Sequence, residues 1–242
     1  MEEKKAVWEE TFEVDWETVS LDNHIKLTDL IKNLLKVAVD HAEHLGFGFT
    51  NTSKEDLSWV LLRLNVQVER LPAWKEKIKV YTWPSRVKTL TAFREFEVKD
   101  EQDRVLCRAT SEWSVINLKT RRPQPVNSLK DLYQPPPDSE FLTRPFPMPD
   151  NSHPFEELFS QKVRYTDMDM NGHVNAGKYF DWFSDALYEV SGTNKVSFIS
   201  FHYIRECRLG EKITLEKGTD NPMEIRGVKP DGKLAFWASA EN

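Results

Sequence analysis

The sequence predicts an α+β protein with two similar halves, each folding an antiparallel sheet around one long helix. Three observations lead to this prediction: an amphipathic helix followed by several strands, a second copy of that order, and a proline-rich segment between the copies. The chain has 242 residues, of which 39% are hydrophobic and 12% aromatic. This is enough to build two small domains, each with a core of its own.

The first long helix is predicted from Thr28 to Leu45. Its apolar residues recur at the spacing of one helical face from Leu30 to Ala42, and Gly46 marks its end. One helix accompanied by several strands indicates a sheet wrapped around that helix. The predicted strands are Val7–Trp16, Asp56–Arg70, Ile78–Trp83, Leu90–Lys99 and Val105–Leu118, with a hairpin turn at residues 99–104.

Prolines are concentrated in the middle of the chain. Nine of the thirteen prolines lie between Pro123 and Pro154. Because proline cannot donate to a sheet ladder and breaks helix interiors, this segment is predicted to be an extended linker. The predicted organisation is an N-terminal unit at 1–123, a linker at 124–155 and a C-terminal unit at 156–242.

The second half repeats the order of the first. Three segments match in the same order, which favours a duplicated unit over coincidence between two sheet-rich segments. Two such units in tandem form the double hot-dog fold. The matched pairs are residues 24–34 with 173–183, 69–78 with 205–213, and 104–112 with 233–241.

Composition argues against several classes of function. The net charge is -6, so there is no basic excess to neutralise the phosphates of nucleic acid. The first residues lack the apolar stretch of a signal peptide, and no apolar run reaches the ~18 residues of a membrane span. Cys107 and Cys207 form no disulfide framework, which suits a reducing compartment. We therefore expect a soluble, cytoplasmic protein whose partner is neither nucleic acid nor a membrane.

The most reactive side chains lie in one loop just before the second predicted helix. Asp169, Asn171 and His173 alternate there, and Asn175 is the predicted N-cap. Unpaired N–H groups and the helix dipole favour negative charge at a helix start, which suits chemistry on a carbonyl group. Histidine titrates near neutral pH and exchanges protons. A structural histidine, a turn asparagine and a plain loop carboxylate are the alternative interpretations.

The matching loop around His24 lacks the Asp-x-Asn pattern, which predicts one catalytic half and one binding half. No histidine shows trustworthy metal-ligand spacing with cysteine or carboxylates, and no glycine-rich phosphate loop occurs. The sequence therefore predicts neither a metal nor a cofactor.

Glu206 and Cys207 compete for a place at this site. Both are predicted to lie in a strand that begins at Val196, where neighbouring side chains point to opposite faces unless a bulge intervenes. Glu206 is either a base acting on water or a solvated edge glutamate. Cys207 is either a nucleophile paired with His173 or a small buried apolar residue. The spacing alone does not choose between them.

Residues 164–179 closely resemble the signature of acyl-acyl-carrier-protein thioesterases. Arg205-Glu206-Cys207 is similar to that family's Arg-Glu-Cys motif. Three segments of the first half also resemble the family in order and spacing, so the resemblance covers nearly the whole chain, in a compact bacterial form. These segments are residues 59–64, 82–85 and 109–123.

The resemblance implies a tandem hot-dog enzyme that hydrolyses the thioester between a fatty acyl chain and the phosphopantetheine of acyl carrier protein, which terminates fatty acid synthesis. The first half is implied to bind the acyl chain and to set its length. The implied catalytic residues are Asp169, Asn171, His173 and Glu206, with Cys207 the nucleophile of an older scheme.

Three other functions stay open: an acyl-coenzyme A hydrolase of the same fold, a hot-dog dehydratase, and a non-catalytic acyl-binding module. Monomer and homodimer are both compatible with the sequence. An acidic carrier protein would need a local basic patch, for which the candidates are Lys119, Arg121, Arg122, Arg205 and Arg208.

Overall fold

Met1–Arg144 and Pro145–Asn242 form two separate units of the computed structural model. The structure describes residues 5–126, 142–150, 152–170, 172–193 and 195–242. Half of the predicted linker lies outside the described residues, and the predicted unit boundaries stay a prediction. Among the described residues, no helix is both long and apolar enough to cross a membrane.

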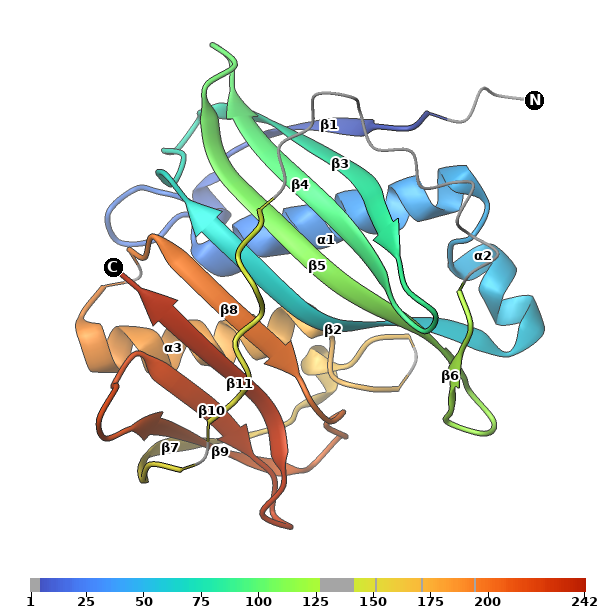
Figure 1. The fold of residues 1–242 in the computed structure, drawn as a ribbon. Helices are drawn as coiled ribbons and strands as arrows, with labels where there is room; N and C mark the ends of the chain where they lie inside the picture. Colours follow the sequence, from blue (N-terminus) through green and yellow to red (C-terminus); the bar gives the residue numbers. More distant parts are fainter. Residues whose placement is uncertain (1–4, 127–141, 151, 171, 194) are drawn as a thin grey trace. The chain divides into compact units, whose positions relative to one another are not determined.

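The N-terminal unit is built around α1, which spans Leu27–Leu45 and lies along one face of its sheet (Figure 1). One apolar face of α1, which includes Leu30, Ile31 and Leu34, is buried, and Gly46 ends the helix with a left-handed φ of 86°, which suits glycine. The strands follow the antiparallel order β1-β3-β4-β5-β2, with β6 on β5. Their bounds are β1 Trp8–Glu13, β2 Leu57–Val68, β3 Lys77–Val87, β4 Ala92–Asp100, β5 Val105–Asn117 and β6 Pro123–Gln124; the short helices are η1 Trp16–Thr18, α2 Phe49–Thr52 and η2 Ser53–Glu55.

The predicted helix and strands of this half are confirmed, with one shortened element. The strand predicted to reach Trp16 ends at Glu13, because the chain turns there into η1. The predicted hairpin between β4 and β5 is organised by Asp100, whose carboxylate accepts hydrogen bonds from the backbone N–H groups of Gln102 and Arg104. Burial pushes the pKa of Asp100 upward, but these bonds and the Arg104 side chain bring it down to about 2.

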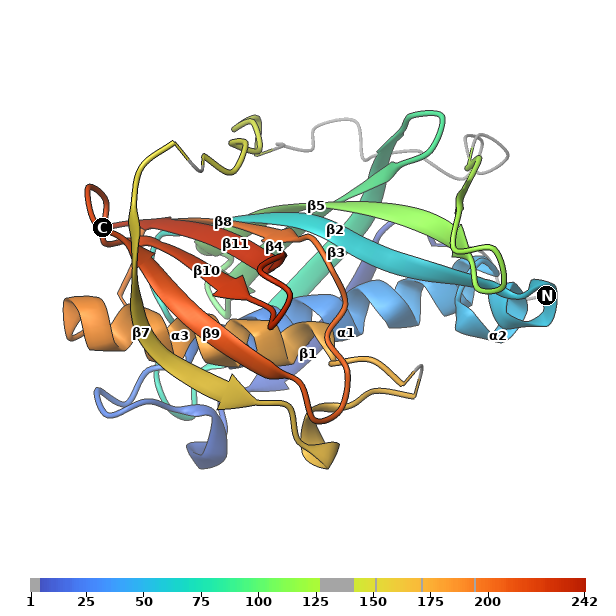
Figure 2. The ribbon, with the colours of Figure 1, turned by 90° about the horizontal axis from the view of Figure 1, so that it is seen from below.

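The C-terminal unit repeats this plan around α3, Ala176–Ser191, with its sheet curving around the helix (Figure 2). Its strands follow the antiparallel order β8-β11-β10-β9-β7. Aromatic rings fill the space between sheet and helix: Phe201 stacks on Phe180 at 4.2 Å and on Phe236 at 5.1 Å between ring centroids. The remaining bounds are β7 Phe155–Lys162, η4 Tyr165–Asp167, β8 Phe198–Tyr203, β9 Lys212–Gly218, β10 Glu224–Val228 and β11 Leu234–Glu241.

The duplication extends to single hydrogen bonds in the loop before each helix. In the C-terminal unit the Asp169 N–H donates to the carbonyl of His173 at 2.8 Å. In the N-terminal unit the Ser20 N–H donates to the carbonyl of His24, also at 2.8 Å. The predicted alignment of His24 with His173 is therefore confirmed, and Ser20 stands where the C-terminal unit has Asp169.

The same comparison identifies the N-terminal counterpart of Glu206. The Val174 N–H donates to the carbonyl of Cys207, whereas in the N-terminal unit the Ile25 N–H donates to the carbonyl of Pro72. Cys207 therefore matches Pro72. The residue before it, Leu71, stands where the C-terminal unit has Glu206.

Candidate active site

The loop before α3 is closed by its own hydrogen bonds. Met168 and Val174 form an isolated antiparallel bridge, and the Asp169 carboxylate accepts from the His173 N–H at 3.3 Å. Gly172 has a left-handed φ of 76°, which suits glycine. Asp169 thus holds the backbone of His173. Asn171 lies outside the described residues, and its predicted role stays a prediction.

Asn175 is the N-cap of α3, as predicted. Its side chain accepts a hydrogen bond from the Gly177 N–H at 2.9 Å. Its own N–H donates to the carbonyl of Asp167 at 2.8 Å. Asn175 therefore links the first turn of α3 to the preceding loop. This link places His173 near the positive end of the α3 dipole.

Glu206 is not in a strand, which corrects the prediction. The strand β8 ends at Tyr203, and Glu206 lies in the loop between β8 and β9. The physical reason is a bulge: the N–H groups of Ile204 and Arg205 both donate to the carbonyl of Ala235, at 2.9 and 3.0 Å. Two residues opposite one partner bend the strand and end its ladder. The chain after the bulge then turns toward the loop of His173.

His173 and Glu206 meet as an ion-paired or hydrogen-bonded couple. His173 Nε2 lies 3.0 Å from Glu206 Oε2, and the two side chains are 25% and 30% exposed. Arg208 Nη2 contacts the other carboxylate oxygen of Glu206 at 3.3 Å. Lys229 Nζ donates to the backbone carbonyl of Glu206 at 2.7 Å. The pair is thus held in place from several sides, yet remains open enough to receive a substrate.

Cys207 faces away from solvent, in contrast to its neighbour. Its side chain is buried, and its N–H donates to the hydroxyl oxygen of Tyr179 at 2.9 Å. Burial raises the pKa of the Cys207 thiol to about 11. Because the thiolate is the nucleophilic form, this surrounding suits a packed side chain better than a nucleophile. The geometry therefore favours the pairing of His173 with Glu206.

Three residues outside the predicted catalytic set support this site. Asp167 is buried and accepts a hydrogen bond from the Arg164 N–H at 2.7 Å. A carboxylate three residues after the start of a tight turn is a pattern that the sequence shows. Lys229 and Tyr179 gave no such signal, because their contacts come from distant parts of the chain.

The N-terminal loop cannot form the same pair. His24 Nδ1 lies 2.9 Å from the carbonyl oxygen and 3.5 Å from the carboxylate of Asp22 in its own loop, and Leu71 offers no carboxylate at the position of Glu206. The described residues contain no group of three or more His, Cys, Asp and Glu side chains placed to hold a metal ion.

Each unit wraps an antiparallel sheet around a helix, and the second unit sets a histidine–carboxylate pair at the start of that helix. These features define a tandem hot-dog protein with one site-bearing half. The family model of the acyl-ACP thioesterase N-terminal domain matches residues 5–135, and that of the C-terminal domain matches residues 152–230. The chain belongs to the acyl-ACP thioesterase family.

Curated relatives agree with this assignment. Oleoyl-acyl carrier protein thioesterase 2 of Arabidopsis thaliana, a chloroplastic protein, is 30% identical over 225 residues, which cover 84% of this chain and 60% of the relative. The palmitoyl-acyl carrier protein thioesterase of Cuphea hookeriana, also chloroplastic, is 28% identical over 230 residues, covering 88% and 54%. The chain thus spans about 60% or less of the length of these relatives.

Solved structures share the fold. An acyl-ACP thioesterase from Bacteroides thetaiotaomicron superposes with a TM-score of 0.83 at 24% identity, covering 98% of this chain and 97% of the other. A 12:0-ACP thioesterase from Umbellularia californica gives 0.79 at 23% identity, with coverage of 98% and 97%. The predicted double hot-dog fold is confirmed.

Proposed function

We propose that this chain hydrolyses the thioester between a fatty acyl chain and acyl carrier protein, releasing the free fatty acid. The observation that carries the proposal is the 3.0 Å contact of His173 Nε2 with Glu206 Oε2 beside the start of α3. Membership of the acyl-ACP thioesterase family supports it, as do the names of the relatives. The partner is then a carrier protein whose phosphopantetheine arm bears the thioester.

The pair suits proton transfer from water. In the neutral tautomer whose Nε2–H donates to Glu206, the lone pair of His173 is on Nδ1. Nδ1 takes a proton from water as the water oxygen adds to the thioester carbonyl carbon, and Glu206 orients the ring and stabilises the imidazolium. The intermediate then collapses, the C–S bond breaks, and the thiol leaves with the proton from His173. The products are one carboxylic acid and one thiol.

The negative charge that develops on the carbonyl oxygen needs hydrogen-bond donors. We assign this role to Asn171, aided by the positive end of the α3 dipole, and loss of one such donor typically costs ~10²–10³-fold in turnover. Asp169 acts as a positioning residue through the His173 backbone. We also assign the chain to a reducing compartment such as the cytoplasm, which suits the buried free thiols of Cys107 and Cys207.

Hydrolysis of a panel of acyl-carrier-protein thioesters, from short to long chains, tests the proposal. We expect free fatty acid and free thiol in equal amounts, and a loss of ~10²-fold or more in kcat for Glu206→Gln. The exposed Glu156 in β7 provides a matched control, because Glu156→Gln makes the same chemical change away from the site.

The same assay separates the other functions. Preference for acyl-coenzyme A offered side by side would make the chain an acyl-coenzyme A hydrolase. Formation of an enoyl thioester would make it a dehydratase. Binding of the acyl substrate without turnover would make it an acyl-binding module. Each of these outcomes contradicts the proposal.

A further inference from the structure

Large apolar side chains stand exposed around the loop of His173. Tyr165, Met170 and Leu209 are 83%, 76% and 60% exposed. Exposed apolar residues that gather at one place mark interaction surfaces more often than residues scattered singly.

Backbone contacts bring the segments of these three residues together. Val163, two residues before Tyr165, donates to the carbonyl of Glu211 at 2.9 Å and accepts from the Gly210 N–H at 3.1 Å. The turn that contains Leu209 therefore adjoins the segment of Tyr165. The bond from the Val174 N–H to the Cys207 carbonyl joins the loop of Met170 to the same turn.

Cations surround these apolar side chains. Lys162, Arg164 and Arg208 are exposed, and Arg208 also touches Glu206 of the candidate active site. The carboxylates of the same turn are already engaged, since Glu206 contacts His173 and Glu211 accepts from Lys229 at 2.8 Å. We call the six residues the C-terminal rim: Lys162, Arg164, Tyr165, Met170, Arg208 and Leu209.

The duplicated fold supplies an internal comparison for the apolar part of this rim. By the hydrogen-bond match between the two loops, Tyr165, Met170 and Leu209 correspond to Trp16, Leu21 and Trp74 of the N-terminal unit. These are likewise 68%, 93% and 50% exposed. The apolar character is therefore common to both units.

The charges differ between the two units. The strands β1 and β7 end at Glu13 and Lys162, so these positions correspond. Two residues further on, the exposed Asp15 corresponds to the exposed Arg164. Ala73 stands where the C-terminal unit has Arg208. At these three positions the C-terminal unit thus has cations throughout, whereas the N-terminal unit has two carboxylates and an alanine.

We propose that the C-terminal rim is the docking surface for a partner protein with an acidic surface, which under the proposed function is the acyl carrier protein. Its apolar side chains pack against the partner, and its cations steer the partner to the half that holds His173 and Glu206. The carboxylates of the N-terminal unit repel the same partner from the loop of His24. Docking at the rim brings the thioester of the carrier arm to the site that Arg208 borders.

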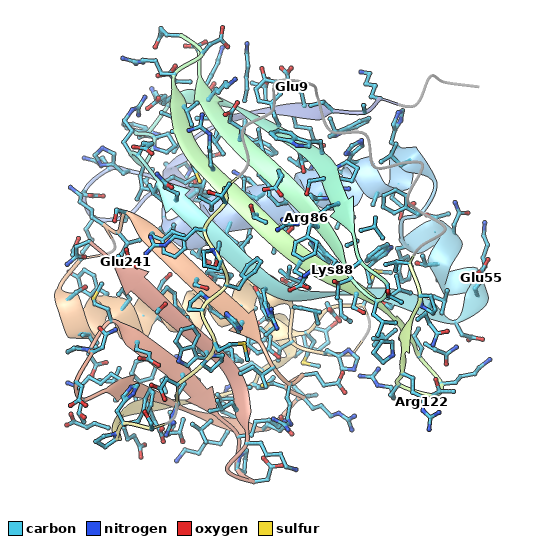
Figure 3. All side chains as sticks on the ribbon, in the orientation of Figure 1. Glu9, Glu55, Arg86, Lys88, Arg122 and Glu241 are labelled. Carbon is cyan, nitrogen blue, oxygen red and sulfur yellow. The ribbon has the colours of Figure 1, made fainter. Side chains whose placement is uncertain are left out.

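The other predicted cations fit this role less well. Lys119 forms an ion pair with Asp56 and belongs to the N-terminal unit, which lacks the pair of His173 and Glu206. Arg121 and Arg122 lie between β5 and β6 of the N-terminal unit. Figure 3 labels Arg122 at this turn. Of the five candidates, only Arg205 and Arg208 belong to the loop of Glu206.

Charge reversal at the rim tests the proposal. The double variant Lys162→Glu/Arg164→Glu is expected to raise KM for the acyl carrier protein by about tenfold or more, and to remove most of its salt dependence. Hydrolysis of an acyl-pantetheine without the carrier is expected to stay unchanged, because neither residue touches the site. A matched double variant in the N-terminal unit, Lys54→Glu/Lys77→Glu, changes the net charge equally and is expected to leave both substrates unaffected.

The apolar part of the rim has its own test. Met170→Ser is expected to raise KM for the carrier substrate with no change in salt dependence, while the corresponding Leu21→Ser leaves KM unchanged. A direct titration with the carrier protein, using a His173→Ala background so that the thioester survives, measures docking without turnover. This titration keeps the docking test meaningful even where the proposed hydrolysis fails.

Three results would overturn the docking assignment. One is carrier binding to the rim variants that equals binding to the parent protein. Another is that the parent protein binds anionic lipid vesicles and that the rim substitutions abolish this binding but not carrier binding. The rim would then be a membrane-binding surface. The third is that the chain self-associates, as measured by light scattering, and that the same substitutions abolish self-association without changing carrier binding. The occupant of the rim would then be a second copy of this chain.

Discussion

At the scale of single residues, burial separates Glu206 from Cys207. A cysteine near a histidine suggests a nucleophile, and the two residues are adjacent in the sequence. In the fold the Glu206 carboxylate is partly exposed against His173, whereas the Cys207 side chain is buried. A catalytic group must reach its charged form and contact the substrate, which the exposure of Glu206 permits and the burial of Cys207 opposes.

Cys207→Ala is therefore expected to keep most of the turnover of the parent protein. Its cost falls on stability, by roughly 1 kcal/mol, because a small buried side chain is lost. Steady-state hydrolysis of an acyl carrier protein thioester and urea unfolding measure the two effects. A loss of turnover as deep as that of His173→Ala would restore the cysteine-nucleophile scheme.

At the scale of elements, the N-terminus of α3 has a side-chain cap that the N-terminus of α1 lacks. The Asn175 side chain accepts from the Gly177 N–H, whereas Lys26 at the start of α1 gives no side-chain cap. The start of α3 is where the loop of His173 is attached. Its cap thus contributes to stability and keeps the site in place.

Asn175→Ala is expected to lower the free energy of unfolding by about 1 kcal/mol, because an N-terminal N–H of α3 loses its acceptor. Asn175→Ser should restore most of that loss. Lys26→Ala, at the corresponding position of α1, is the matched control and should have a smaller effect. Equal losses for Asn175→Ala and Lys26→Ala in urea unfolding would argue against the cap.

The contact of α1 with β4 contains a buried histidine. His41 Nδ1 accepts from Arg94 Nη1 at 3.0 Å, and His41 Nε2 donates to the carbonyl of Lys5 at 2.9 Å. This arrangement requires the neutral ring. Burial, together with the positive charge of Arg94 and a smaller effect of His44, lowers the pKa of His41 to about 4.

The N-terminal unit is therefore expected to lose stability on acidification. An unfolded chain protonates His41 near pH 6.5, while the folded chain does not do so until about pH 4. The contribution of His41 is fully present above pH 6.5 and is lost as the pH falls to 4, by roughly 3 kcal/mol. Urea unfolding at pH 7 and pH 4 should show this difference in the parent protein and not in His41→Gln. Equal pH dependence in the two proteins would contradict a neutral buried His41.

At the scale of the whole molecule, one fold unit occurs twice, and the two copies carry different residues beside the loop histidine. The loop hydrogen bonds are the same in both halves, yet Leu71 occupies the place of Glu206. In the N-terminal half, His24 lies 3.5 Å from the carboxylate of Asp22 in its own loop and has no counterpart of Glu206. The duplication thus preserved the scaffold, and under the proposed function only the C-terminal copy carries out the proton transfer.

His173→Ala is expected to reduce kcat by ~10²–10⁴-fold, since it removes the proton acceptor. His24→Ala, the same change at the matching position, should leave kcat near that of the parent protein. Both side chains lie at the surface of a loop, so the melting temperatures should change little. Comparable losses of kcat in the two variants would show that both halves contribute to the chemistry.

The fold class, the duplication, the polar loop and the Asn175 cap could all be predicted from the residues alone. These features depend on spacing along the chain, such as apolar periodicity in Thr28–Leu45, and on residue types acting over a few positions. The folded chain is needed to see that a bulge opposite Ala235 ends β8 and lets Glu206 meet His173. The contact of Lys229 with the Glu206 carbonyl and the burial of Cys207 also follow only from the fold. The reason is physical: these contacts join residues far apart in the chain, and the packing of sheet against helix sets them.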